Sequence, residues 1–373
     1  MKHETQQFRT WVEVSESAIR NNVKVVKKLL NPETKLMAVV KSNAYGHGPA
    51  TAGLFSKYGV DWFGVDNIDE AIELRKQGIR KPILVLGYTP LERARDAVFY
   101  NVQSTIYDAG WFKSSKLKSK NYKLHLKIDT GMSRQGVLVD DLPKLLRQIP
   151  KGLNFEGVFT HFANADNLKD RSYPNLQFSR FKKALNLISS SGIKFEMIHA
   201  AATTGLLTMP ESHLDLVRAG VALYGLWPSV EFAKKFQHLN LKPVLSWRTR
   251  IVQIKNISRG TPIGYGIAEQ VKKKTTIGVL PVGYYDGYSR NLSSLGEVLV
   301  NGKRCKVLGR LSMNLTVIDL SKTQNAKVWD EAVLIGKQGK SEITATEIAD
   351  RIKTISYEVV SRINPLLPRI YKK

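Results

Sequence analysis

The feature that most constrains the fold is a regular alternation of short apolar runs with helical segments over the N-terminal part of the chain. A continuous apolar run such as Leu36–Val40 is typical of a strand buried on both faces, because a half-exposed strand would alternate apolar and polar residues. Helical patterns lie between most of these runs, for instance at Ile68–Lys76, which stops before Gly78. The predicted strands are Leu36–Val40, Phe63–Val65, Ile83–Leu86, Gln103–Ile106, Leu124–Ile128, Phe155–Thr160, Phe195–Ile198 and Leu214–Val217. About eight strand–helix units predict a (β/α)8 TIM barrel; a doubly wound sheet, which usually has fewer strands, is the alternative.

Beyond Leu239 the pattern changes, because strands now follow one another without long helices between them. The dipeptide Asn301-Gly302 inside "GEVLVNGKRCKVLG" is typical of a tight hairpin. We therefore expect an α/β barrel over residues 11–238 and a mainly antiparallel β domain over residues 239–373, with residues 1–14 as candidates to pair with the second domain.

The composition is that of an ordinary globular protein. Of 373 residues, 43% are hydrophobic and 24% charged, and neither a secretory h-region nor a run of about 20 apolar residues occurs. The single cysteine, Cys305, cannot form an intrachain disulfide and is expected to be a small buried side chain in a strand. These features predict a cytoplasmic protein with no membrane partner.

The charge balance is unusual. The chain has 57 Lys and Arg against 32 Asp and Glu, a net charge of +25. Such an excess is typical of some nucleic-acid-binding proteins, but here the lysines are scattered over helical faces and no nucleic-acid-binding module is recognisable. We interpret the charge as a solvated surface, and a nucleic-acid role would rest on charge alone.

The stretch "KLMAVVKSNAYGHG" suggests chemistry at the end of a strand. Lys41 follows the apolar run directly, Gly46 and Gly48 allow backbone to approach a ligand, and Tyr45 and His47 add hydrogen-bonding groups. A carbonyl-binding lysine that forms a Schiff base is the functional interpretation; a lysine that only points to water is the alternative. Barrel active sites collect where strands end, and further candidates at such ends are Arg134, His161, Thr203, Arg218, Gly220 and Val221.

No metal site is expected. The seven histidines are dispersed, and neither H-E-x-x-H nor a pair of C-x-x-C motifs occurs.

Motifs spread over nearly the whole chain carry a resemblance to one family. They are "AVVKSNAYGHG", "KIDTGMSRQG", "FTHFANAD", "RAGVALYG", "GYGI", "VGYYDGYSR", "GRLSMN" and "ISYEV". In this order and spacing the chain resembles alanine racemases, enzymes that use pyridoxal 5'-phosphate (PLP) and are built from a barrel and a β domain. The resemblance implies interconversion of L-alanine and D-alanine, which would supply D-alanine for peptidoglycan.

The resemblance also implies how the reaction is divided. Lys41 would bind PLP covalently and act as one base, and Tyr265 would act as the other, because inversion needs a proton removed on one face and returned on the opposite face. Family members place this tyrosine in the partner's active site, so a homodimer with shared active sites is implied.

Further roles follow from the same resemblance. Arg218 would bond the pyridine nitrogen of PLP, and Arg134 would bond the phenolic oxygen of PLP and the substrate. His161 would connect Arg218 to Tyr265; a purely structural histidine is the alternative. Met313 would offer its backbone N–H to the substrate carboxylate. Lys127 matches a position that is carbamylated in many members; an ordinary strand lysine is the alternative. The phosphate would be held by Tyr45, Thr203, Gly220, Val221 and Tyr357, and the substrate's access corridor would be lined by Asp166, Tyr284, Arg290, Arg310 and Ile355.

The chain departs from the family pattern at two places. Asn314 stands where an aspartate is usual, and Ala202-Thr203 stands where Asn-Ser is usual. Two other functions compete: a racemase acting on serine or basic amino acids, against which Tyr357 argues because it fills the side-chain space in alanine-selective relatives, and a PLP-binding homeostasis protein, which would lack the β domain and a counterpart of Tyr265.

Overall fold

The computed structural model describes residues 7–113, 122–150, 152–323 and 325–373. The chain forms two compact units. The barrel unit consists of the described residues of 22–44 and 49–223, and the β unit consists of those up to Asn21, of 45–48 and of 224–373.

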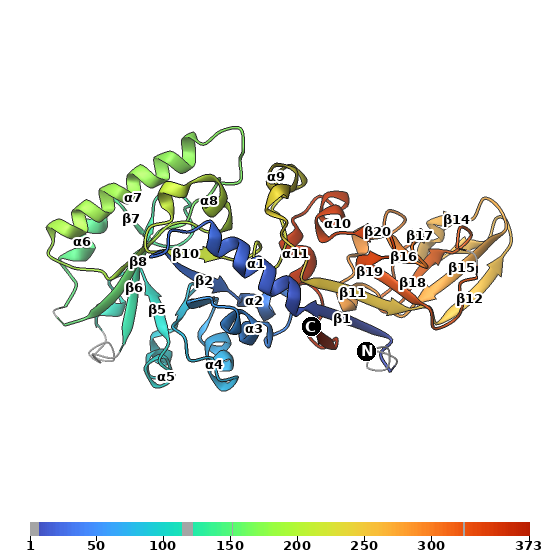
Figure 1. The fold of residues 1–373 in the computed structure, drawn as a ribbon, viewed down its shortest axis with the longest axis horizontal. Helices are drawn as coiled ribbons and strands as arrows, with labels where there is room; N and C mark the ends of the chain where they lie inside the picture. Colours follow the sequence, from blue (N-terminus) through green and yellow to red (C-terminus); the bar gives the residue numbers. More distant parts are fainter. Residues whose placement is uncertain (1–6, 114–121, 151, 324) are drawn as a thin grey trace. The chain divides into compact units, whose positions relative to one another are not determined.

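The barrel unit is built on one parallel sheet (Figure 1). Its strands are hydrogen-bonded in the order β10-β2-β3-β4-β5-β6-β8-β9, and a parallel bridge between Ala202 and Arg218 links the segment after β9 to β10, so the barrel is nearly closed. The strands are β2 (Lys35–Val39), β3 (Trp62–Val65), β4 (Ile83–Val85), β5 (Gln103–Ile106), β6 (Lys123–Asp129), β8 (Asn154–Phe159), β9 (Met197–His199) and β10 (Leu216–Ala219), with the short β7 (Val137–Leu138) paired to β6. The predicted barrel is confirmed, and the doubly wound sheet is wrong.

Helices lie around the outside of these strands (Figure 1). The segment predicted over Ile68–Lys76 is helix α4, which begins after Asn67, whose side chain accepts a hydrogen bond from the Glu70 N–H. The other elements are α1 (Glu16–Lys28), α2 (Lys41–Tyr45), α3 (Thr51–Lys57), α5 (Ala94–Phe99), α6 (Leu142–Leu146), α7 (Ser172–Ser190) and α8 (Thr203–Thr208), with 3-10 turns η1 (Leu91–Arg93), η2 (Trp111–Lys113) and η4 (Pro210–Ser212).

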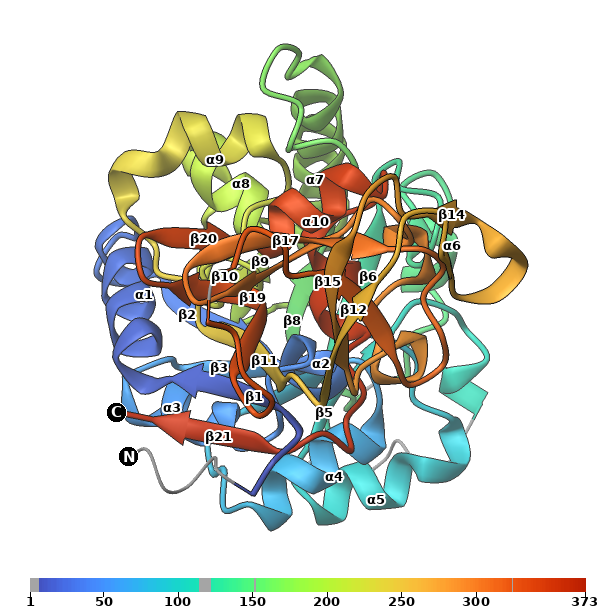
Figure 2. The ribbon, with the colours of Figure 1, turned by 90° about the vertical axis from the view of Figure 1, so that its right-hand side faces the viewer.

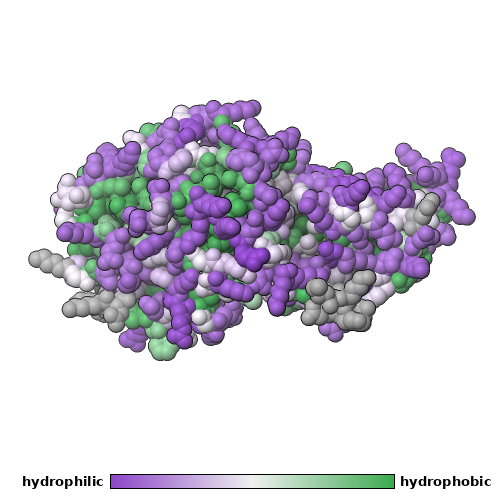
Figure 3. Space-filling view, viewed as in Figure 1, coloured by the Kyte–Doolittle hydropathy of each residue, from purple (hydrophilic) through white to green (hydrophobic). Residues whose placement is uncertain are grey.

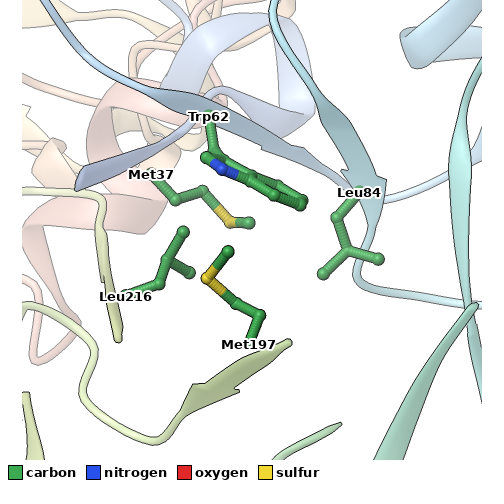
Figure 4. Close-up of a cluster of buried hydrophobic side chains, with 5 residues drawn as sticks. All are labelled: Met37, Trp62, Leu84, Met197 and Leu216. Carbon is green, nitrogen blue, oxygen red and sulfur yellow. The ribbon is translucent and has the colours of Figure 1, made fainter. Parts of the chain in front are cut away.

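An apolar cluster fills part of the barrel interior (Figure 4). Side chains from five strands meet there, and each is at most 3% exposed: Met37, Trp62, Leu84, Met197 and Leu216. Removing such side chains from water contributes about 1.5 to 3 kcal/mol each. Through Trp62, this cluster packs against the polar part of the barrel interior.

Two strands begin later than the sequence indicates. The strand predicted from Leu214 begins at Leu216, because Leu214 has a φ of 51° and left-handed backbone cannot continue into a strand. The strand predicted from Phe195 begins at Met197. Elsewhere the predicted and observed barrel strands differ at their ends by at most one residue.

The β unit contains the long antiparallel part of the fold (Figure 2). Its main sheet has the order β12-β15-β18-β17-β16-β19-β11-β1-β21, with β20 paired to β19. The strands are β1 (Thr10–Ser15), β11 (Leu245–Arg250), β12 (Gln253–Ile257), β15 (Thr275–Leu280), β16 (Glu297–Val300), β17 (Lys303–Leu308), β18 (Thr316–Asp319), β19 (Glu331–Gln338), β20 (Ser341–Ile343) and β21 (Arg369–Lys372), beside the small pair β13 (Pro262–Ile263) and β14 (Glu269–Gln270).

Short helices complete this unit. They are α9 (Val230–Phe236), α10 (Ala345–Arg351) and α11 (Ser356–Ser361), with 3-10 turns η5 (Gln237–Leu239), η6 (Tyr265–Ile267), η7 (Tyr284–Asp286) and η8 (Arg290–Leu292).

Strand β1 joins the N-terminal segment to this sheet. It pairs antiparallel with β11 and parallel with β21, which lies beside it in Figure 2. The buried Glu13 carboxylate binds both Arg248 and Lys372, so one side chain connects the three strands. Residues 1–6, which belong to the segment expected to pair with the β domain, lie outside the described residues.

Two local predictions in this unit agree with the structure. The Asn301-Gly302 hairpin between β16 and β17 is confirmed, with φ values of 48° and 72°, and Cys305 is buried in β17 as expected. The stretch "VLSWRTRIVQIKNI" forms two strands, β11 and β12. The chain changes partners there, because the Ile251 N–H bonds to Asp330 and the Val252 N–H bonds to Val279, so β11 and β12 are separate.

Most of the face shown in Figure 3 is hydrophilic, with apolar areas interspersed. Among the described residues no helix combines the length and the apolarity needed to cross a membrane.

Candidate active site

The segment after β2 has an unusual backbone. Residues Ser42, Asn43, Ala44 and Tyr45 have φ values of 56°, 57°, 50° and 52°, so the helix labelled α2 is left-handed. Left-handed conformation costs an L-residue about 1 to 2 kcal/mol, and such strain is concentrated at functional sites. This left-handed turn follows Lys41 directly. The backbone after β2 therefore adopts a conformation that L-residues disfavour.

Two acidic residues hold the start of this turn. The Glu70 carboxylate accepts hydrogen bonds from the backbone N–H of Ser42 (2.6 Å) and of Asp66 (2.8 Å). The Asp66 carboxylate in turn accepts from the Lys41 ammonium at 3.2 Å. This bond ties Lys41 to the end of the neighbouring strand. The Lys41 side chain is half-buried, and its amine remains accessible.

Arg218 is the most enclosed charge in the barrel unit. It is 3% exposed, and burial lowers its pKa to about 9. Its Nη1 donates to His199 Nδ1 (2.7 Å), and its Nη2 donates to the Thr160 and Ala200 carbonyls (both 2.8 Å) and to His161 Nδ1 (3.2 Å). None of these bonds uses the Nε–H or the second Nη1–H, so the guanidinium is held in place and the Nε–H is a donor for a ligand.

His161 and Lys127 lie within the electrostatic range of Arg218. Burial, then Arg218 and Arg134, hold the pKa of His161 well below its usual range, so the imidazole is neutral. Burial and the same two arginines lower the pKa of Lys127 to about 7. Lys41 adds to both shifts. The structure thus brings together the basic residues Lys41, Lys127, Arg134, His161 and Arg218, and we call these five residues the basic cluster.

The loop that carries Arg134 is shaped by one carboxylate. Asp129 accepts hydrogen bonds from the backbone N–H groups of residues 131–134 at 2.8 to 3.2 Å. Beside it, Lys127 donates to the Gln135 side-chain carbonyl at 2.7 Å, and the Gln135 amide donates to the Gly87 carbonyl.

The candidates for phosphate binding in the barrel unit lie together. The Thr203 hydroxyl, at the first residue of α8, accepts a hydrogen bond from the Gly220 N–H at 3.1 Å, and Val221 follows directly. Ala202, immediately before the helix, provides the carbonyl that accepts from the Leu206 N–H, so its methyl side chain leaves the helix start intact.

The remaining aromatic candidates for phosphate binding lie in the β unit. The ring of Tyr45 is 5.1 Å from that of Tyr224 and 6.4 Å from that of Tyr357. Gly46, next to Tyr45, packs so closely on α11 that a Cβ there would lie 1.9 Å from the Val360 carbonyl oxygen. Tyr45 and Tyr357 are thus brought together.

Tyr265 lies on an exposed loop of the β unit. Its side chain is 70% exposed, between Gly264 and Gly266, which both have a φ of 69°. A Cβ on Gly266 would lie 2.7 Å from the Arg310 guanidinium, so Arg310 packs against the loop that carries Tyr265.

Met313 and Tyr284 also lie on adjoining segments of this unit. The backbone N–H groups of Tyr284 and Tyr285 donate to the Ser312 and Met313 carbonyls. The other corridor candidates are not joined to them by hydrogen bonds in the part of the chain that the structure describes: Ile355 is the residue before α11, and Arg290 and, in the barrel unit, Asp166 are exposed.

Sequence analysis missed four residues that shape this site. Glu70 had a local signal, because Asn67-x-x-Glu70 resembles a capping box, yet its carboxylate bonds to Ser42 and Asp66 instead of capping α4. Gln103, His125 and His199 had none beyond being polar positions in predicted strands. Within the described residues no group of three or more His, Cys, Asp and Glu side chains is arranged to hold a metal ion.

Comparison with known proteins identifies the family. Residues 14–228 match the family described as alanine racemase, N-terminal domain, and residues 244–371 match alanine racemase, C-terminal domain. The alanine racemase of Carboxydothermus hydrogenoformans is 41% identical over 368 residues, which cover 97% of this chain and 99% of that protein. That of Methanococcus maripaludis is 38% identical over 370 residues, covering 97% and 98%.

Solved structures agree. The crystal structure of alanine racemase from Bacillus anthracis with bound L-Ala-P superposes with a TM-score of 0.92 at 36% identity, covering 98% of this chain and 95% of that one. The structure from E. faecalis gives a TM-score of 0.90 at 34% identity, covering 98% of each chain. Because both domains match in order and the relatives align from end to end, this chain belongs to the alanine racemase family and is an isomerase that interconverts L-alanine and D-alanine.

Proposed function

We propose that the chain racemises alanine with PLP by a two-base mechanism in which Lys41 and Tyr265 act on opposite faces of the substrate. The observation that carries this proposal is the position of Lys41: it follows the barrel strand β2, is followed by the left-handed turn, and lies among the other residues of the basic cluster. The alanine racemases that align with the whole chain support the same reaction.

The residues present fit PLP. The cofactor carries an aldehyde, a phosphate dianion and a ring with a basic nitrogen. The barrel unit offers an amine at Lys41, the Thr203 hydroxyl with the Gly220 N–H that bonds to it, the adjoining backbone of Val221, and the unused Nε–H of Arg218. Backbone N–H groups beside glycine suit an anion. When bound, PLP withdraws electrons from the amino acid and so acidifies its α-proton.

Arg218 and His161 would set the electronic environment. Arg218 donates every hydrogen bond it makes and stays charged, so it would hold the ring nitrogen unprotonated, with electron withdrawal weaker than an acidic partner would give. Neutral His161 accepts from Arg218 at Nδ1 and keeps its Nε2–H for the tyrosine. Arg134 would bind the phenolic oxygen of PLP and the substrate.

Tyr265 would come from a second copy of the chain. The Tyr265 side chain is 70% exposed, and other large apolar side chains of the same unit are exposed as well. Exposed apolar surface of this kind supports an interface with a second copy. These side chains are Tyr265, Ile267, Tyr284, Tyr285, Met313, Leu315 and Ile355. In such a homodimer Met313 would offer its backbone N–H to the substrate carboxylate, and Tyr284, Arg290, Arg310, Ile355 and Asp166 would line the access corridor.

Lys127 is the proposed site of carbamylation. A pKa of about 7 makes its amine substantially neutral at neutral pH, which is the form that adds CO2, and the nearby arginines would stabilise the resulting anion. Tyr357 and Tyr45 would bind the phosphate, and Tyr357 would restrict the side-chain space to alanine. A role in D-alanine supply for peptidoglycan and a cytoplasmic location stay predictions.

The test is α-proton exchange of L-alanine and D-alanine in D2O with chiral analysis, for the wild type and Tyr265→Phe. We expect the wild type to invert both enantiomers, and the variant to exchange one enantiomer's proton slowly without inverting it. If the wild type shows the PLP-lysine absorbance and inverts serine or lysine in preference to alanine, alanine is not its substrate. If it inverts no amino acid, the proposed two-base mechanism is wrong.

A further inference from the structure

A chain of buried side chains crosses the barrel interior below Arg218. Arg218 Nη1 bonds to His199 Nδ1 (2.7 Å), His199 Nε2 bonds to His125 Nδ1 (3.1 Å), and His125 Nε2 bonds to the Gln103 side-chain carbonyl (2.7 Å). The four residues come from β10, β9, β6 and β5, and each is at most 4% exposed.

The direction of every bond in this chain follows from its first member. An arginine guanidinium has no acceptor, so His199 must accept at Nδ1 and, as a neutral imidazole, carries its proton on Nε2. His125 must then accept at Nδ1 and donate from Nε2. The last group must be an acceptor, and Gln103 supplies a carbonyl oxygen.

Neutral rings are required throughout. A proton added to either histidine would set two N–H donors against each other, at the His199–His125 contact or at the Arg218–His199 contact. Burial and the charge of Arg218 hold the pKa of His199 well below its usual range and lower that of His125 to about 3.

The surrounding residues are shaped to hold the two rings. His199 stacks on Phe159 with 4.7 Å between ring centres and a 7° angle, and Trp62 packs edge-on against His125. On β8, a Cβ added to Gly157 would lie 2.4 Å from His125 Nδ1, so this position has room for the ring only because it is glycine.

We propose that Gln103 is a positioning residue for Arg218, acting through His125 and His199: its carbonyl accepts the last proton of the chain, which holds both rings as the Nε2–H tautomers that Arg218 requires and so keeps the guanidinium in place for the ligand. This inference deepens the proposed function, on which it rests for the identity of the ligand that Arg218 faces.

The first test reads the tautomers directly. The ring nitrogens of 15N-histidine-labelled protein are observed by NMR without cofactor, in the wild type and in Gln103→Leu and Gln103→Glu. We expect Nε2–H at both His125 and His199 in the wild type and in Gln103→Glu, which keeps an acceptor. An Nδ1–H tautomer or an imidazolium at either ring in these two proteins overturns the proposal, even if Gln103→Leu fails to fold.

The second test asks whether the effect reaches the reaction. In Gln103→Leu the His125 N–H loses its acceptor, and we expect kcat to fall about tenfold with KM changed less than about twofold, while Gln103→Glu stays within about threefold of the wild type. Ser104→Ala is the matched control, because it removes a buried hydrogen bond to Thr89 from the same strand without touching the chain of bonds.

The outcomes separate the two hypotheses. Equal losses in Gln103→Leu and Ser104→Ala, or unchanged tautomers and kcat in Gln103→Leu, would overturn the role of Gln103. A protein with the expected tautomers but no alanine racemisation would instead overturn the proposed function, because the NMR measurement needs neither PLP nor substrate.

Discussion

Glu70 lies in the first turn of α4, yet its carboxylate is bonded at 2.6 Å to the backbone N–H of Ser42, inside the left-handed turn that follows Lys41. Its second oxygen binds the Asp66 N–H, and Asp66 contacts the Lys41 amine. One side chain therefore fixes both the backbone after Lys41 and the acid beside it.

Replacing Glu70 should disturb the site more than the fold. In Glu70→Gln one of the two N–H groups faces an amide donor instead of an acceptor, and an unmade bond of this kind costs about 1 to 3 kcal/mol. We expect kcat to fall at least about tenfold and PLP to dissociate faster, measured by steady-state kinetics and by loss of PLP absorbance on dilution. Glu73→Gln, an exposed position on the same helix, is the control; equal effects in both variants would contradict the anchoring role.

Lys127 should make stability depend on pH. Burial and two nearby arginines lower its pKa from 10.5 to about 7, so between these values the unfolded chain binds a proton that the folded chain has released, and the free energy of unfolding rises with pH. Relative to Lys127→Met, the wild type should gain about 2 kcal/mol between pH 7 and pH 9. Urea unfolding in CO2-free buffer measures this. Lys24→Met, at an exposed position, serves as the control. If the pH-dependent gain in unfolding free energy of the wild type is no larger relative to Lys127→Met than relative to Lys24→Met, Lys127 is protonated in the folded protein.

Two glycines should respond in opposite ways to the same change. Gly157→Ala places a methyl group 2.4 Å from His125 Nδ1 and should destabilise the protein by about 1 to 3 kcal/mol. Gly53→Ala lies within helix α3 with nothing within 4 Å and should stabilise it by about 0.5 to 1 kcal/mol. Thermal or urea unfolding distinguishes them, and a Gly157→Ala protein as stable as the wild type would mean that His125 can move aside.

Shared active sites predict complementation between inactive copies. Lys41→Ala and Tyr265→Phe should each be nearly inactive alone, but a mixed dimer would contain one site with both original residues. Refolding the two in equal amounts should therefore restore about a quarter of wild-type racemisation. Restoration of none, with mixed dimers present on mass spectrometry, would show that Tyr265 serves its own chain.

The barrel could be predicted because most of its strands are short apolar runs and helical patterns lie between most of these runs. Strand ends were harder, because they depend on single backbone conformations such as the left-handed Leu214, which local composition does not specify. The break between β11 and β12 at Ile251 and Val252 has no local sequence signal, because the chain changes sheet partners there without any Gly or Pro to mark it.

The candidate site divides in the same way. Lys41 and Arg218 were visible as charges at the ends of apolar runs. The residues around Lys41 already suggested a Schiff base, whereas its role as a catalytic base and the role of Arg218 came from the family resemblance. In β6 the alternation "KLHLKID" would ordinarily place the polar face in solvent, but the strand is buried on both faces and His125 and Lys127 lie inside the unit. Contacts such as His125 with Gln103 join residues 22 positions apart and arise only when β5 pairs with β6.

The left-handed turn after Lys41 has a consequence for how this protein can change. Ser42 is exposed and sits at a φ of 56°, so glycine there would relieve backbone strain without removing any packing. Ser42→Gly should therefore raise the unfolding free energy by about 0.5 to 1 kcal/mol while lowering kcat, and unfolding and kinetics on the same sample measure both. At this position, greater stability and the correct orientation of the Lys41 amine are therefore competing demands. Selection for stability alone would replace Ser42 and lower the activity.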